Sequence, residues 1–139
     1  MSLSEIAQSL RDQIVDAYAI SFNQFGEKHK TTQKMNELSQ CFGTLRECLA
    51  LAMPNESFYE SRKTPVYNVG VTHLQDEKPQ EFTSQQQLYI RTMCGSLSEF
   101  LEQVKPLLGN QAGRVFKKLN RRIKSVRKLV RDEKRIQIK

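Results

Sequence analysis

Tryptophan is absent from this sequence of 139 residues, which also contains only three cysteines. Its longest apolar run extends only from Cys48 to Met53, far short of the roughly 20 residues that a membrane-spanning helix needs. The first seven residues include Glu5 and no basic residue, so we expect no secretory signal. Few, widely spaced cysteines argue against a disulfide-stabilised scaffold. The sequence therefore predicts an intracellular protein of a reducing compartment, the cytoplasm.

Motifs of catalysis and metal binding are scarce as well. The chain has two histidines, and it contains no Cys-x-x-Cys or His-x-x-x-His pair and no glycine-rich nucleotide-binding motif. A Cys–His nucleophile built on Cys48 or Cys94 is conceivable, but free cysteine more often serves as a small buried hydrophobe. Asp12 and Asp16 fall opposite a predicted apolar stripe, so we expect them to be solvated. We therefore expect no enzyme and no catalytic, cofactor-binding or metal-ligating residues.

Apolar residues recur at spacings of three and four in the first 53 residues, which is typical of helices with one buried face. One stripe covers Leu3–Phe25 and begins with a capping-box pattern, Ser2 followed by Glu5. A second helix opens at Thr31 or Thr32 and stops before Pro54. The short connection between the two predicts an antiparallel helical hairpin over residues 2–53.

Residues 83–135 predict a second helical hairpin. Thr83 and Gln86 form another capping-box pattern, and we expect the helix that follows to end or kink at Pro106. Asn110 is a candidate cap for the last helix, which we expect to run to Arg135 with the remaining residues frayed or extended. The apolar side chains of this last helix are Val115, Leu119, Ile123, Val126 and Val130.

Residues 54–82 interrupt the helical rhythm and contain three of the four prolines. Within them Val66–Leu74 is rich in β-branched residues and could be extended, although no partner strand is evident. We favour a long ordered loop packed over the helices. An arm that pairs with a second copy of the chain, giving a homodimer, is the alternative. The expected fold is one all-α domain over residues 1–139, a four-helix bundle-like arrangement of two hairpins.

Basic residues are concentrated at the C-terminal end. Residues 114–139 contain 12 Lys and Arg against only Asp132 and Glu133, whereas the first 113 residues carry 10 basic and 13 acidic side chains. On a helical wheel, most of these cations face away from the apolar stripe, and like charges such as Lys117 and Arg121 stand four residues apart and repel. The pattern predicts a polyanionic partner. The candidate binding residues are Arg114, Lys117, Lys118, Arg121, Lys124, Lys128, Arg131 and Arg135.

Nucleic acid is the partner that we favour, because Lys and Arg on a rigid helix can follow a phosphate backbone. The basic segment has one aromatic residue, Phe116, on its apolar flank, so base stacking is not expected and binding should be independent of sequence. RNA and DNA stay open as partners. The alternative is a protein-interaction module whose basic helix docks on an acidic protein. An anionic membrane surface is a weaker candidate, and a merely solvated helix face is the simplest explanation.

Overall fold

The computed structural model describes residues 2–58 and 81–138, with the side chains of all these residues except Gln111 and residues 131–138. All regular secondary structure in these residues is helical. Four α-helices are present: α1 (Leu3–Phe25), α2 (Lys30–Ala52), α3 (Ser84–Leu108) and α4 (Gly113–Ile138). A single 3-10 turn, η1 (Gly109–Ala112), joins the last two. The expected all-helical class is confirmed, whereas the extended segment at Val66–Leu74 lies outside the described residues.

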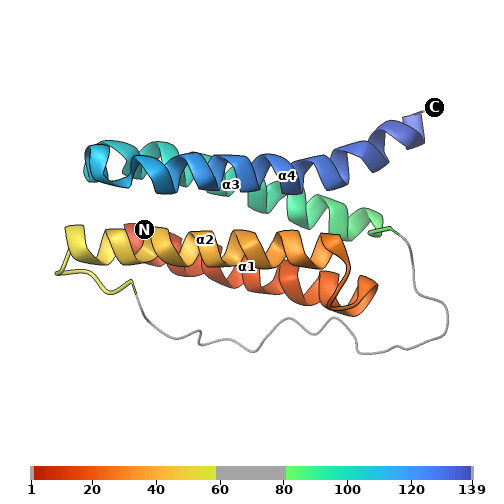
Figure 1. Cartoon of the computed structure of the whole chain (residues 1–139), viewed down its shortest axis with the longest axis horizontal. Helices are drawn as coiled ribbons and strands as arrows, with labels where there is room; N and C mark the ends of the chain where they lie inside the picture. Colours follow the sequence, from red (N-terminus) through yellow and green to blue (C-terminus); the bar gives the residue numbers. More distant parts are fainter. Residues whose placement is uncertain (1, 59–80, 139) are drawn as a thin grey trace.

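The helices lie side by side in a bundle-like arrangement, with α1 and α2 forming one pair and α3 and α4 the other (Figure 1). Helix α2 packs against both α1 and α4, and α3 packs against both α4 and α1. The end of α1 meets the start of α3, where the Gln24 side-chain amide donates hydrogen bonds to Gln86 Oε1 at 3.1 Å and to the Glu81 carbonyl at 3.2 Å. Each helix therefore runs antiparallel to both of its neighbours. No helix in the described segments combines the length and the apolarity that a bilayer span requires.

Local capping explains where the helices begin. Both predicted capping boxes are present, at Ser2 with Glu5 and at Thr83 with Gln86. Helix α2 begins at Lys30, earlier than expected, because His29 Nδ1 accepts the Thr31 backbone N–H at 3.1 Å.

The Thr32 hydroxyl helps to hold the first hairpin closed, because its one proton is shared between two backbone carbonyls. Thr32 Oγ1, expected as part of the helix start, is instead buried between α1 and α2. It lies 3.1 Å from the Ser21 carbonyl and 2.7 Å from the Gly26 carbonyl, at the C-terminal end of α1. Gly26 itself has φ 93°, a backbone conformation that favours glycine at the end of a helix.

The boundaries of the second hairpin differ from expectation at three points. Helix α3 continues through Pro106 to Leu108, because the loss of the one Pro106 N–H is offset by the packing of Leu108 against the core. Asn110 does not cap α4; it lies within η1, and its carbonyl accepts the Gly113 N–H. Helix α4 continues to Ile138 rather than ending at Arg135, since no glycine or proline follows Gly113 to interrupt it.

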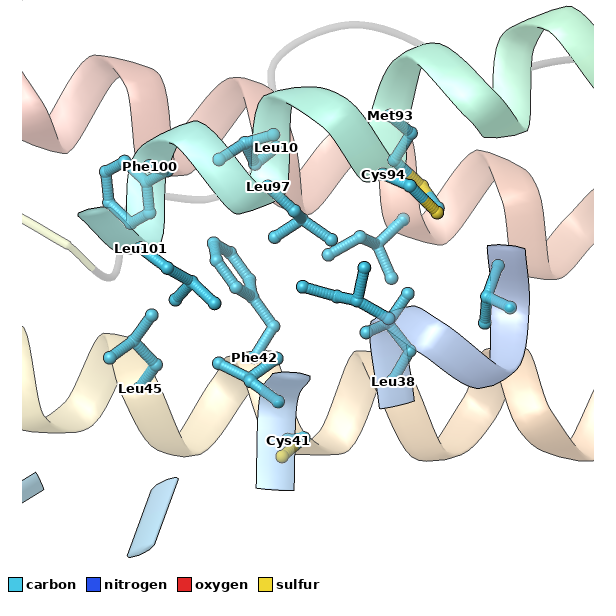
Figure 2. Close-up of a cluster of buried hydrophobic side chains, with 14 of the residues drawn as sticks. Leu10, Leu38, Cys41, Phe42, Leu45, Met93, Cys94, Leu97, Phe100 and Leu101 are labelled. Atoms are coloured by element: carbon cyan, nitrogen blue, oxygen red, sulfur yellow. The ribbon is translucent and has the colours of Figure 1, made fainter. Parts of the chain in front are cut away.

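A single apolar core joins all four helices. Figure 2 shows Leu38 and Phe42 of α2 pointing toward Leu97 and Phe100 of α3 across the interior. Two phenylalanines next to the connecting segment are also buried in this core. Phe58 is the last described residue before residues 59–80, and Phe82 follows them. Burial of these side chains is the main contribution that holds the bundle together.

The expectation that Asp12 and Asp16 are solvated is wrong. Both are half-buried, and the Tyr89 hydroxyl donates a hydrogen bond to Asp16 Oδ2 at 3.2 Å. The physical reason is that α1 is flanked on one side by α2 and on the other by α3, so its polar flank is partly covered as well.

Leu97→Ala should lower the free energy of unfolding by about 2–5 kcal/mol, because Leu97 is fully buried and truncation leaves a cavity. Chemical denaturation followed by circular dichroism measures the loss. The matched control is Glu99→Ala on the exposed face of the same helix, which should change stability by less than about 0.5 kcal/mol. Equal destabilisation by both changes would contradict this assignment of buried and exposed faces.

Candidate anion-binding groove

Helix α4 separates its apolar and basic side chains in the way that its sequence predicts. Four of the five predicted stripe residues, Leu119, Ile123, Val126 and Val130, are buried against the neighbouring helices together with Phe116. Val115, the fifth, is half-buried and lines the groove described below. All six candidate cations with described side chains are exposed: Arg114, Lys117, Lys118, Arg121, Lys124 and Lys128. The apolar face docks the helix and leaves the cations to its outer face and flanks.

A groove of about 480 Å³ lies between α2 and α4. Its α4 wall carries five cations together with Val115: Arg114, Lys117, Lys118, Arg121 and Arg122. Its α2 wall consists of residues spaced three or four apart, which share one helix face: Glu37, Gln40, Cys41 and Thr44. Glu37 is the one carboxylate among the described residues of the lining. The groove therefore combines a strongly basic wall with a mostly neutral, polar one.

The structure brings together four of the eight predicted residues in this groove and leaves two outside it. Arg114, Lys117, Lys118 and Arg121 line the groove, whereas Lys124 and Lys128 are exposed further along α4 and do not. The side chains of Arg131 and Arg135 fall outside the described residues, although both positions belong to α4.

Sequence reasoning missed Arg122, which lies in the groove. It stands four residues after Lys118 and so shares its side of the helix, a spacing that could have identified it. Its Nη1 lies 3.2 Å from Glu37 Oε1 of α2, and the two side chains are 34% and 48% exposed. This ion pair connects the two walls of the groove. The flank of α4 that faces α2 therefore carries positive charge, as its outer face does.

The other cations of the groove have no partner within the described part of the chain. Arg114, Lys117, Lys118 and Arg121 make no ion pair or hydrogen bond there, and the same holds for Lys124 and Lys128. Arg127 lies on the opposite flank of α4, where its Nη2 donates a long hydrogen bond of 3.5 Å to Ser98 Oγ of α3. The cations of α4 stand three or four residues apart and repel one another, so an anion bound among them would stabilise the folded helix.

The cysteine thiols are all free. Burial raises the pKa of the Cys41 thiol at the edge of the groove, and the neighbouring Lys118 and Arg122 charges partly oppose this rise. Burial also raises the pKa of the Cys94 thiol, to about 11, against a smaller opposing effect of Arg127. A raised pKa disfavours the reactive thiolate, so neither thiol is prepared for nucleophilic chemistry.

The described residues contain no group of three or more His, Cys, Asp and Glu side chains that could hold a metal ion. Among its described lining residues the groove has five cations and one carboxylate, a surplus of positive charge that is suited to an anion.

No known protein family, curated protein or solved structure matches this chain.

Raising the pH from 8 to 10.5 should destabilise the protein partly through Cys94. The unfolded thiol, with a pKa near 9.0, releases its proton in this range, whereas the folded thiol, with a pKa of about 11, retains it, so stability falls as the pH rises. Equilibrium denaturation at both pH values should show that wild type loses roughly 2 kcal/mol more than Cys94→Ala, at about 1.4 kcal/mol per pKa unit. An identical loss in both proteins would contradict the burial of this thiol.

Proposed function

We propose that this protein is a non-catalytic nucleic-acid-binding protein that contacts the phosphate backbone through α4 and the groove beside it. The observation that carries the proposal is the set of six exposed α4 cations without a partner in the described residues, four of which share one groove with Arg122. A polyanion that contacts them would release condensed counterions, which is the main source of sequence-independent affinity for nucleic acids.

The length of the basic face suits several consecutive phosphates. From Arg114 to Lys128 the helix rises about 21 Å at 1.5 Å per residue. That distance corresponds to roughly six nucleotide steps along the axis of a B-form duplex at about 3.4 Å per step. A rigid helix of this length can hold five or six Lys and Arg side chains against one backbone at the same time.

Recognition of bases is not part of the proposal. Phe116, the aromatic residue of α4, is buried in the core and cannot stack on a base. Long flexible cations contact phosphates and position a protein without reading sequence. The proposal therefore covers RNA and DNA alike.

A protein with an acidic surface is the second candidate partner. It is favoured by an apolar hollow of about 600 Å³ at the end of the bundle where α4 begins, lined by residues of α2, the end of α3 and η1. Leu51 and Leu107 in this hollow are 85% and 51% exposed. A protein could cover these leucines while acidic side chains contact the groove, whereas a nucleic acid would leave the leucines exposed.

Reversing two charges on α4 should weaken nucleic-acid binding. Arg121→Glu combined with Lys124→Glu should lower the affinity for a random-sequence duplex at least about ten-fold at low salt, because both side chains are exposed on the proposed surface. For wild type, log affinity plotted against log salt should have a slope of about −4.5 to −5.4, equivalent to five or six phosphate contacts. Fluorescence anisotropy with a duplex and a single strand, across a salt series, measures both quantities.

The matched control is Lys28→Glu combined with Lys30→Glu, which changes the net charge equally at exposed positions by the turn between α1 and α2. This control should bind within about two-fold of wild type, since these residues make no contact with the proposed surface. If wild type binds neither oligonucleotide at low salt, or if both double variants bind alike, the proposal fails and an acidic protein becomes the preferred partner.

A further inference from the structure

The groove between α2 and α4 differs from the outer face of α4 in having two walls. Lys118 and Arg122 project from the flank of α4 that faces α2, and Arg114, Lys117 and Arg121 extend the same wall outward. Across from them, Gln40 is exposed, and its side-chain amide makes no hydrogen bond within the described residues. An anion in the groove would therefore meet donors from two helices, which the outer face does not provide.

The dimensions of the groove suit a small molecule. Its volume of about 480 Å³ lies within the range of about 300–1,000 Å³ that is typical of small-molecule sites. Among the described residues the lining contains no aromatic side chain, and Val115 and Cys41 are its apolar residues, beside the aliphatic stems of the lysines and arginines. A base or another flat apolar group would gain little here, whereas several phosphate groups would each find a cation.

We propose that the α2–α4 groove binds a compact small molecule with three or more clustered phosphate groups, and that Glu37 limits the affinity. This proposal goes beyond nucleic-acid binding, because it depends on the α2 wall and on Arg122, whereas the nucleic-acid proposal depends on the exposed cations along α4. Five cations and one carboxylate give the lining a surplus of positive charge that matches a ligand of this kind.

Glu37 acts against the ligand in two ways. Its carboxylate pairs with Arg122, with 3.2 Å between Oε1 and Nη1, and so competes with a phosphate for this guanidinium. Its negative charge also lies within the lining and repels an anion there. Replacing Glu37 by glutamine should therefore strengthen binding, an effect that a damaged fold would not produce.

Inorganic tripolyphosphate is the probe that tests this site, titrated by isothermal calorimetry into the full chain. We expect one molecule bound per chain. Lys118→Gln combined with Arg122→Gln should weaken binding at least about ten-fold, through the loss of two charged hydrogen-bond donors. Lys124→Gln combined with Lys128→Gln removes the same charge outside the groove and should change the affinity less than about two-fold.

Two further comparisons sharpen the result. Glu37→Gln should raise the affinity about three-fold or more, whereas Glu47→Gln, an equal charge change on the exposed side of α2, should not. Adenosine triphosphate should bind about as well as tripolyphosphate, because the groove offers no aromatic contact to the base. Circular dichroism confirms that each variant remains folded.

The outcomes separate this proposal from the nucleic-acid proposal. Absence of tripolyphosphate binding at low salt would overturn the small-molecule proposal. An equal loss of affinity in the double variant inside the groove and the double variant outside it would also overturn it, as would an unchanged affinity in Glu37→Gln. Such a result would leave the nucleic-acid proposal unaffected, because oligonucleotide binding is measured separately in the same buffer. Tripolyphosphate binding without oligonucleotide binding would overturn the nucleic-acid proposal and retain this one.

Discussion

The packing of α4 against α2 and α3 is the interaction on which the exposed basic surface depends. Helix α4 buries one apolar stripe, including Leu119, Ile123 and Val126, and is otherwise strongly basic. Because the stripe must face the core, the helix can present its cations only on its outer face and its two flanks. The docking that stabilises the bundle is thus also what positions the charge.

The groove arises where one of these flanks meets a polar face of α2. Helix α2 turns Leu38, Phe42 and Leu45 inward, and the face beside them carries Glu37, Gln40 and Thr44. Antiparallel packing brings this face alongside the early turns of α4, where the Glu37–Arg122 ion pair joins the two helices. The five cations that line the groove repel one another, and among the described lining residues only Glu37 offsets their charge. An anionic ligand would relieve this repulsion.

Periodicity and capping patterns were sufficient to predict most of the fold. The stripes and capping boxes located all four helices, since a capping box is a local hydrogen-bond pattern that depends on few residues. Helix boundaries were less predictable where a residue can either lie within a helix or mark its end. Pro106 lies within α3 rather than ending it, because Leu108 beyond it packs against the core, and His29 caps α2 where Thr31 or Thr32 was expected.

The candidate site was predictable on α4 and unpredictable across the bundle. A helical wheel places Lys117 and Arg121 on an exposed face, and both are exposed. It carries no information about the neighbouring helix, so neither the α2 wall nor the role of Arg122 could be deduced from α4 alone. The burial of Asp16 against Tyr89 was missed for the same reason, because tertiary neighbours are set by how the two hairpins pair.

If phosphates bind to α4 and to the facing side of α2, nuclear magnetic resonance should locate the contacts residue by residue. The uniformly labelled protein is titrated with a short random-sequence duplex at low salt. We expect the largest chemical-shift changes at residues 114–128, smaller changes at residues 37–44 and none along the exposed sides of α1 and α3. Changes centred on α1 or α3, with residues 114–128 unaffected, would contradict this expectation.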